Sequence, residues 1–214
     1  MAHNYPLMLD VTDRLVVIVG GGAVAVRKAR GLIDCGATRV RCVSPRFDAD
    51  IPDGVERVES RYDAGHLDGA TLVFAATDDP AVNATVVRDA RARGILVNRA
   101  DATDDGEPSD FSTPAKFVDG TVTVTVSAGG SPALAALIRD GIEAKWDARW
   151  TRMAEAMQSI RPMIARRAVL PPPTRQRIFR ELATEQSLAV VAERGVDGLR
   201  GWLLERFPEL KAHA

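Results

Sequence analysis

The stretch VVIVGGGAVAVRKARGL, from Val16 to Leu32, decides the fold of this chain. Its first four residues are apolar and mostly β-branched, which is typical of a strand buried in a parallel sheet. Three consecutive glycines follow, and a helix-forming segment at 23–35 then ends at Gly36. A strand, a glycine turn and a helix in this order predict the start of a βαβ unit.

The spacing Gly20-x-Gly22-x-x-Ala25 predicts a dinucleotide-binding turn. The first glycine permits the tight turn, the second lets the backbone approach a pyrophosphate, and Ala25 allows the helix to pack closely on the strand. Amides at the helix start would meet the negative phosphates, and the helix dipole adds to the attraction. The alternative is a glycine-rich turn that binds nothing.

Length and composition limit the classes of protein to consider. At 214 residues the chain suits one large domain or two small ones and needs no disulfide bonds. Cys35 and Cys42 form no CxxC pair, so we expect buried, reduced thiols. Because His3, His66 and His213 are scattered, we expect no metal site. The chain shows no signal sequence and no apolar run of about 18 residues, so we expect it in the cytoplasm and not in a membrane.

Strand and helix signals alternate over the first hundred residues. Apolar or alternating runs predict strands at 5–10, 16–19, 38–43, 55–59, 71–77 and 95–98. A helix is predicted at 81–93, after the cap and first-turn proline of Asp78-Asp79-Pro80 and before Gly94. This alternation predicts an α/β fold, a Rossmann-type doubly wound parallel sheet.

The pattern changes at Arg99. A polar loop at 99–112 precedes a strictly alternating strand at 121–127, and Pro132 suits the first turn of a helix that continues to Trp146. The rest has no strand signal and predicts a helical bundle interrupted at Pro162 and at 171–173. We expect the chain to divide into three parts, with boundaries at 1–112, 113–146 and 147–214.

Positive charge collects in the helical tail. Arginines crowd the segment from Lys145 to Arg180, where the only acidic residues are Asp147 and Glu155. The tail is either a solvated helix surface or a cradle for a polyanionic small molecule, because arginine binds carboxylates with two parallel hydrogen bonds. Nucleic acid is not expected, since the net charge is -1 and no aromatic residues interleave the basic ones.

Four blocks of sequence occur together in one known family: GGGAVAVRKARGL at 20–32, FAATDDPAVN at 74–83, VNRAD at 97–101 and VSAGGSPALA at 126–135. On these blocks the chain resembles the siroheme-synthase N-terminal family, over about residues 5–145. Its members are precorrin-2 dehydrogenases with or without sirohydrochlorin ferrochelatase activity. The resemblance implies oxidation of the tetrapyrrole precorrin-2 by NAD to sirohydrochlorin, in some members followed by insertion of iron to give siroheme.

The resemblance also implies a quaternary structure and a role for each part. The first part would be the dinucleotide-binding domain, and the middle part, a small α+β segment, would make the contact within a homodimer. The helical tail would face the tetrapyrrole.

The same resemblance assigns residues to NAD. The implied contacts are Gly20, Gly22, Ala23, Val24, Ser44, Pro45, Thr77 and Asp78. Dehydrogenases that prefer NAD often carry an acidic residue after the second strand, and here there is none. Ser44 can bond to one ribose hydroxyl, while Arg46 can attract the extra phosphate of NADP, so cofactor choice depends on the resemblance. Thr77 and Asp78 can equally cap the following helix.

Asp101 is the candidate catalytic residue, because it matches the family's essential aspartate in the N-x-x-D block that starts at Asn98. A carboxylate near the nicotinamide could accept the proton lost in the oxidation, or protons from pyrrole nitrogens as iron enters. Without the resemblance, a turn aspartate that bonds to its own backbone is the first interpretation.

The resemblance further implies substrate contacts at Ser127, Gly129, Gly130 and Ser131, near the tetrapyrrole carboxylates. Many family members have one more hydroxyl and one more residue in this turn, where this chain has Ala128. Two other functions stay open. The chain could be an NAD(P)-dependent oxidoreductase of another anionic substrate, or a nucleotide-sensing domain without chemistry, for which neither Asp101 nor this turn is needed.

Overall fold

The computed structural model describes residues 5–101, 109–165 and 170–210. The chain forms two compact units, Met1–Thr113 and Pro114–Ala214.

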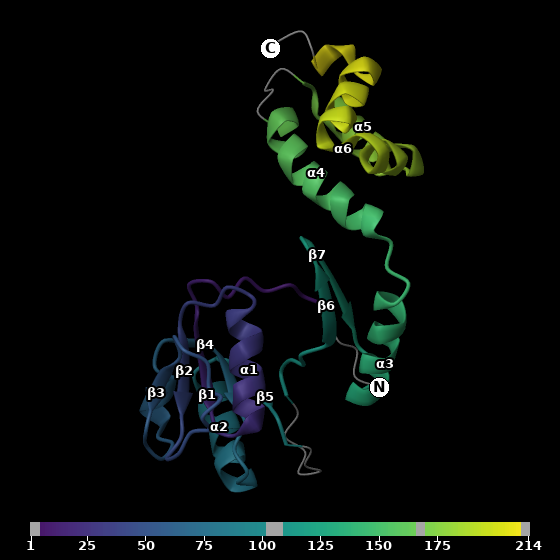
Figure 1. Ribbon diagram of the computed structural model, residues 1–214. Coiled ribbons are helices and arrows are strands. Elements are labelled where there is room, and N and C mark those ends of the chain that lie inside the picture. The colour runs from purple at the N-terminus through teal and green to yellow at the C-terminus, as the bar shows by residue number, and fades with distance from the viewer. Residues whose placement is uncertain (1–4, 102–108, 166–169, 211–214) are drawn as a thin grey trace. The chain divides into compact units, whose positions relative to one another are not determined.

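The first unit is built on a five-stranded parallel sheet (Figure 1). Its strands are β1 Leu15–Val19, β2 Val40–Val43, β3 Glu56–Val58, β4 Ala70–Ala75 and β5 Leu96–Arg99. The spatial order is β3-β2-β1-β4-β5, so the chain reverses its direction of travel across the sheet between β1 and β4. The connections are the helices α1 Ala23–Ile33 and α2 Pro80–Ala92 and the short 3₁₀ helix η1 Ala64–Leu67.

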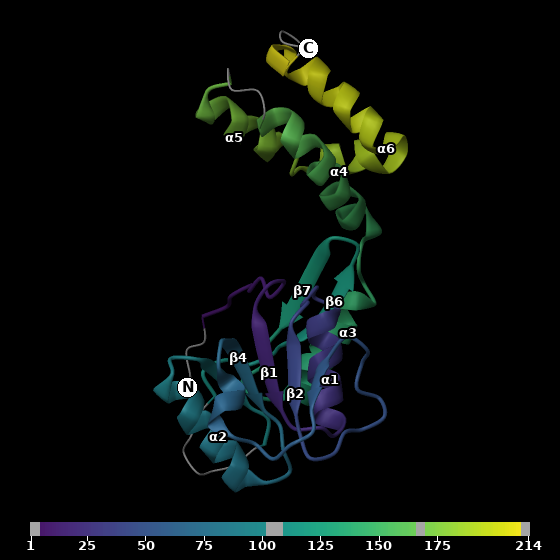
Figure 2. The ribbon, with the colours of Figure 1, turned by 90° about the vertical axis from the view of Figure 1, so that its left-hand side faces the viewer.

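The two helices cover opposite faces of this sheet, as Figure 2 shows. Alternate residues of β1 enter two different cores: Val16 and Ile18 pack with α1, while Val17 and Val19 pack with α2. All five residues of β1 are buried, which explains why its sequence is an unbroken apolar run and not an alternating one. The predicted doubly wound parallel sheet is confirmed.

Glycines end both helices where the pattern predicted. Gly36 follows α1 with φ 82°, and Gly94 follows α2 with φ 68°. Residues with a Cβ rarely adopt this left-handed conformation, so glycine at these points stops the helix and turns the chain towards the next strand.

The second unit contains an antiparallel hairpin of β6 Ala115–Asp119 and β7 Val122–Val126, joined at Gly120, which has φ 54°. The helices that follow are α3 Pro132–Glu143, α4 Ala148–Ala165, α5 Pro172–Glu181 and α6 Glu185–Arg206, with the 3₁₀ turn η2 Pro208–Leu210. A separate apolar core joins α4, α5, α6 and η2. The predicted helical character of the tail is confirmed, and none of the described helices is long and apolar enough to cross a membrane.

Three sequence-based expectations are wrong, and one strand is missing from them. Residues 5–10 are described and form no strand, and the sequence pattern does not predict the strand β6. Pro162 does not interrupt a helix: α4 continues through it, because Ile160 and Ile164 are fully buried and their packing offsets the lost backbone hydrogen bond. Cys42 is buried as expected, whereas Cys35 is exposed at the end of α1.

Candidate functional site

The carboxyl ends of β1, β4 and β5 meet at one edge of the first sheet. The amide of Ala76, just after β4, donates to the carbonyl of Val19 at 2.8 Å, and the amide of Ala100, just after β5, donates to the carbonyl of Ala75 at 2.9 Å. The segments that continue these strands therefore start side by side. Ligands of open α/β sheets bind at this edge, where the strand order reverses, which is between β1 and β4 here.

The three glycines after β1 have different structural roles. A Cβ at Gly20, which has φ 138°, would lie 2.3 Å from the carbonyl oxygen of Ala76, and one at Gly21 would lie 2.2 Å from that of Arg46. Both glycines are therefore required by packing within the protein. A Cβ at Gly22 would meet nothing within 4 Å, so this position faces open space. The first two glycines build the turn, and the third leaves room for a ligand.

The start of α1 is suited to an anion. Gly22 is the N-cap residue, no side chain among the described residues caps the helix there, and the first turn contains no acidic residue. The following amides, at Ala23 and Val24, belong to the positive end of the helix dipole. Open space at Gly22 beside uncapped amides fits the pyrophosphate of a dinucleotide.

The loop after β2 is held against this turn. The hydroxyl of Ser44 donates to the carbonyl of Arg46 at 2.6 Å, and the amide of Asp48 donates to the carbonyl of Gly21 at 2.7 Å. Because the hydroxyl proton of Ser44 is already donated within the loop, Ser44 could only accept a hydrogen bond from a ribose hydroxyl. Pro45 and Arg46 are exposed.

Beyond β4, the side chain of Asn83 fixes Thr77. Asn83 lies in α2 and is fully buried. Its amide oxygen accepts from the Thr77 backbone at 3.1 Å and from the Thr77 hydroxyl at 2.7 Å, and its amide nitrogen donates to the Thr77 carbonyl at 3.0 Å. The cap of α2 is Asp79, which accepts from Ala81 at 2.8 Å, so the capping role considered for Asp78 belongs to its neighbour.

Asp101 follows β5 and forms an ion pair with Arg99. The Arg99 Nε donates to one carboxylate oxygen at 2.7 Å, and a terminal nitrogen donates to the other at 2.9 Å. Only 2% of the Arg99 side chain is exposed, against 20% of the Asp101 side chain. The guanidinium holds the pKa of the Asp101 carboxyl below its usual value, and the nearby side chain of Asn83 lowers this pKa further. Asp101 is therefore an ionised carboxylate with one side open to solvent.

Asn83 and Arg99 had not been identified from the sequence. An asparagine within a predicted helix and an arginine at the start of a predicted polar loop are weak clues, because both residue types are common on surfaces. Their full burial, which only the fold decides, is what marks them.

The turn at 127–131 lies in the second unit. Gly129 and Gly130 have φ of 55° and 83°, and the hydroxyl of Ser131 accepts from the amide of Leu134 at 3.3 Å as the N-cap of α3. Ser127 is exposed. The hydroxyl of Ser131 thus has a structural partner and retains capacity to bind a further group.

Several tail arginines already bind carboxylates. Arg149 contacts Asp147 at 2.7 Å, Arg177 contacts Glu209 at 2.9 Å, and Arg206 contacts Glu181 at 2.9 Å. These pairs favour the solvated-surface interpretation for the arginines involved. Arg166 and Arg167 lie outside the described residues.

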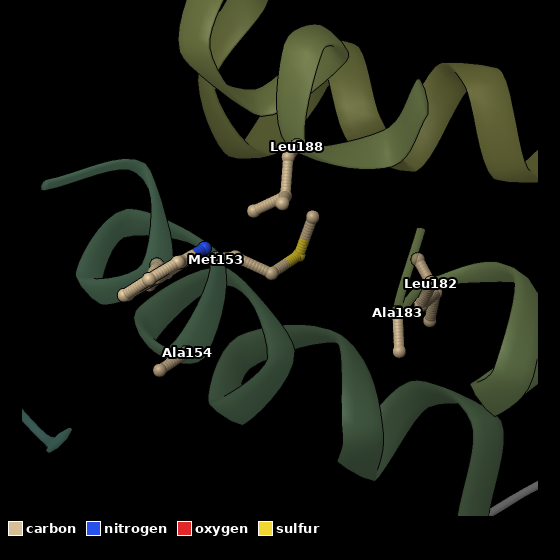
Figure 3. Close-up of a pocket in the computed structure, with 6 residues that line it drawn as sticks. Met153, Ala154, Leu182, Ala183 and Leu188 are labelled. Atoms are coloured by element: carbon tan, nitrogen blue, oxygen red, sulfur yellow. The ribbon is translucent and has the colours of Figure 1, made fainter. Parts of the chain in front are cut away.

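An apolar hollow of about 320 Å³ lies in the second unit, between α4 and the turn that joins α5 to α6. In Figure 3 the side chains of Met153, from α4, and Leu188, from α6, point towards each other across it. Its lining contains none of the residues predicted to bind cofactor or substrate. Across the described parts of the chain, no group of three or more His, Cys, Asp or Glu side chains could hold a metal ion.

Comparison with known protein families gives one matching model, described as "Putative NAD(P)-binding", over residues 7–115. The siroheme synthase of Chromobacterium violaceum is 39% identical over 191 residues, which make up 86% of this chain and 39% of that protein. The siroheme synthase of Azotobacter vinelandii is 37% identical over 199 residues, 90% of this chain and 41% of that protein. The chain thus spans about two fifths of the length of these relatives.

Among solved structures, "SirC, precorrin-2 dehydrogenase" aligns with 94% of this chain and 100% of its own, with a TM-score of 0.74. The sequence identity of the pair is 24%, so this likeness shows a shared fold.

Proposed function

The chain belongs to the NAD(P)-binding family whose model matches residues 7–115, and on that premise we propose that it is an NAD-dependent dehydrogenase that oxidises precorrin-2 to sirohydrochlorin. The names of its relatives support the substrate, since siroheme synthases are similar over most of this chain. The fold shared with a protein named precorrin-2 dehydrogenase agrees with the same reaction.

One observation carries this proposal: a turn open to a pyrophosphate and an ionised carboxylate lie at the same edge of one sheet. Gly20 packs on Ala76, the next residue Thr77 is fixed by Asn83, and Asn83 lies close enough to Asp101 to lower the pKa of its carboxyl. A nucleotide-sensing domain needs the turn but not the carboxylate, so this continuity favours an enzyme.

The reaction removes two electrons and two protons from the tetrapyrrole. NAD would accept both electrons and one of the protons as a hydride. The remaining proton would pass to solvent. The turn at Gly22 and the α1 amides would hold the pyrophosphate, and the loop of Ser44 and Pro45 would contact the adenosine half. The turn at 127–131 would bind substrate carboxylates through backbone amides and the exposed Ser127.

Iron insertion is the second reaction to consider, with ferrous iron as a substrate. It requires a group that takes protons from pyrrole nitrogens, and the ion pair with Arg99 makes Asp101 a weak base. We therefore assign dehydrogenation as the main activity and make iron insertion an outcome of the test below.

We also propose a homodimer that works in the cytoplasm. Leu134, Leu137, Ile138 and Ile142 are exposed at helical spacing along α3, and Val118 is exposed on β6. Exposed apolar residues gathered on adjoining elements are typical of protein contact sites. A second copy of the chain is the partner that the family resemblance implies.

The decisive experiment is anaerobic incubation of the purified chain with precorrin-2 and NAD, followed by absorption spectroscopy. Formation of sirohydrochlorin with stoichiometric NADH supports the proposal. No turnover with NAD or NADP would contradict it, and nucleotide binding without turnover would favour the sensing domain. Ferrous iron added to the product in the same cuvette then tests chelation, with an iron-only control for the uncatalysed rate.

A further inference from the structure

Building on the proposed dehydrogenase function, we infer that Arg99 is a positioning residue that fixes Asp101 as a stationary negative charge beside the reacting tetrapyrrole. In this arrangement Asp101 acts electrostatically and is not the proton acceptor. Neither the sequence pattern nor the names of the relatives assigns a role to Arg99.

The contacts of Arg99 leave its guanidinium little freedom. It binds both oxygens of Asp101, at 2.7 and 2.9 Å, and a terminal nitrogen also donates to the carbonyl of Pro80 at 3.4 Å. The backbone amide of Arg99 donates to the hydroxyl of Ser109 at 2.8 Å. Because two parallel hydrogen bonds set both the distance and the plane of a carboxylate, Asp101 cannot rotate without breaking one of them.

Asn83 relates the surroundings of Asp101 to another element. Its buried amide bonds to Thr77 through both its oxygen and its nitrogen, and it lies close enough to Asp101 to lower the pKa of that carboxyl. The end of β4 and the carboxylate after β5 are therefore neighbours. Since Gly20 packs on Ala76, beside Thr77, Asp101 lies at the same edge of the sheet as the turn proposed to hold the cofactor.

This geometry suits stabilisation of the positive charge that hydride transfer leaves on the tetrapyrrole better than it suits acceptance of the proton. When a hydride leaves the tetrapyrrole, the conjugated ring that remains carries a positive charge until a proton departs to water. A fixed carboxylate nearby stabilises that developing charge without having to reorient. Proton acceptance, by contrast, would leave the buried Arg99 facing a neutral acid, which the ion pair opposes.

The test compares the full-length chain with its Arg99→Met and Arg99→Lys variants in the precorrin-2 assay. Methionine removes the guanidinium, and we expect kcat to fall by about 10², the loss typical of a misplaced reacting group. The KM for NAD, and the Kd for NAD measured by calorimetry, should stay within about twofold, since the contacts described for Arg99 are with Asp101, Pro80 and Ser109. Lysine retains the charge but lacks the planar fork, so it should recover only part of kcat.

Arg41→Met is the matched control. Arg41 is another strand arginine paired with a carboxylate, Glu56 at 2.9 Å, with 23% of its side chain exposed, but it lies in β2 and takes no part in the proposed site. This variant should keep the wild-type kcat. Equal losses in Arg41→Met and Arg99→Met would overturn the inference, because they would reflect general damage to the sheet.

A double-variant cycle tests the pair itself. If Arg99 acts through Asp101, the combined Arg99→Met and Asp101→Asn variant should be no slower than Asp101→Asn alone. Urea unfolding of the same four proteins, without substrate, should show that Asp101→Asn lowers the midpoint more when Arg99 is present. A wild-type kcat in Arg99→Met, or equal midpoint shifts in both backgrounds, would overturn the positioning role. A wild-type chain that leaves precorrin-2 unchanged would instead contradict the proposed function, while the unfolding cycle still reports on the pair.

Discussion

At the scale of single residues, two glycines of the turn are needed for folding and the third is proposed to be needed for binding. Gly20 and Gly21 are required because a side chain at either position would collide with backbone oxygens. Gly22 has ordinary backbone angles, φ -90° and ψ -168°, and free space around it. A methyl group there would occupy the space through which a pyrophosphate approaches the helix start.

Gly22→Ala should therefore keep the fold and lose the cofactor. We expect the free energy of unfolding to change by less than about 1 kcal/mol, the cost of a poorer N-cap. The Kd for NAD should rise at least about tenfold in calorimetry, which corresponds to about 1.4 kcal/mol. Gly20→Ala should behave differently and destabilise the protein, because its φ of 138° and its contact with Ala76 both exclude a side chain.

Gly31→Ala serves as the control for this pair of variants, since Gly31 lies in α1 and a Cβ there would also meet nothing within 4 Å. It should bind NAD like the wild type. Wild-type affinity in Gly22→Ala would show that no pyrophosphate lies against this turn.

Cofactor choice depends on the residue after Pro45. Residues 44–46 contain no acidic side chain that could bind the ribose hydroxyls of NAD, and the exposed Arg46 is the residue proposed to attract the additional phosphate of NADP. We expect Arg46→Glu to raise the Kd for NADP by at least about tenfold while the Kd for NAD stays equal or falls. Competition binding of the two nucleotides measures the ratio, and an unchanged ratio would exclude Arg46 from the site.

At the scale of elements, α3 is the described helix with the most exposed apolar residues. Leu137 is 68% exposed, Leu134, one turn before it, is 48% exposed, and Ile138, the next residue, is 40% exposed. The proposed homodimer explains why such residues are kept at the surface.

Leu137→Glu should convert the dimer into a monomer, because a charge placed in an apolar contact must be desolvated without a partner. Light scattering coupled to size-exclusion chromatography gives the mass directly. Leu96→Glu, at an apolar position of β5 that is 45% exposed, is the control and should leave the mass unchanged. A Leu137→Glu protein with the wild-type mass would place any subunit contact elsewhere.

The packing of α1 on the sheet includes one charged group with a shifted pKa. The Lys28 amine donates to the Thr113 hydroxyl at 2.7 Å and lies 4.9 Å from the centre of the Phe74 ring. Burial lowers the pKa of Lys28 from 10.5 to about 8. Below pH 8 Lys28 is protonated in both the folded and the unfolded chain. Burial of this positive charge then lowers the free energy of unfolding.

Between about pH 8 and 10.5 Lys28 is neutral in the folded chain and still protonated in the unfolded chain. The free energy of unfolding therefore rises with pH over this range, and the cost of burying the charge disappears. We therefore expect the stability of the wild type relative to Lys28→Met to rise between pH 7 and pH 10. Urea unfolding of both proteins at the two pH values measures this difference and cancels other groups, such as Cys42, whose burial raises its thiol pKa to about 12. A difference that is constant or falls with pH would contradict the shift.

At the scale of the whole molecule, each compact unit has its own apolar core. The two cores around the parallel sheet draw all their members from residues before Pro114, and the core of the helical tail lies entirely after it. Every residue proposed to bind NAD belongs to the first unit.

A chain cut after Thr113 should thus fold and bind NAD but not oxidise precorrin-2. We expect a cooperative urea transition and an NAD affinity within about threefold of the full-length value, because the turn and its supports are complete. The turn at 127–131 would be missing, so turnover should be lost. A fragment without a cooperative transition would show that the first unit depends on the second for its stability.

Much of the sheet could be predicted because its signals are local. The apolar run of β1, the glycine spacing after it and the proline after Asp79 each act within a few residues, and the structure confirms the elements that they predict. Segments with mixed signals were predicted less well. Residues 5–10 are largely apolar but pair with no strand in the structure, and β6 is recognised only by its pairing with β7.

The sequence by itself determined the parallel sheet, the open turn at Gly22 and the position of Asp101 at a strand end, since each depends on neighbours along the chain. Only the tertiary structure decided what surrounds Asp101. Asn83, in a helix that precedes β5, lies near it and lowers its pKa. Arg99, two residues away, is its ion-pair partner because the fold buries the guanidinium and leaves the carboxylate partly exposed. Burial is a property of the whole fold, and it turns two ordinary polar residues into the supports of a site.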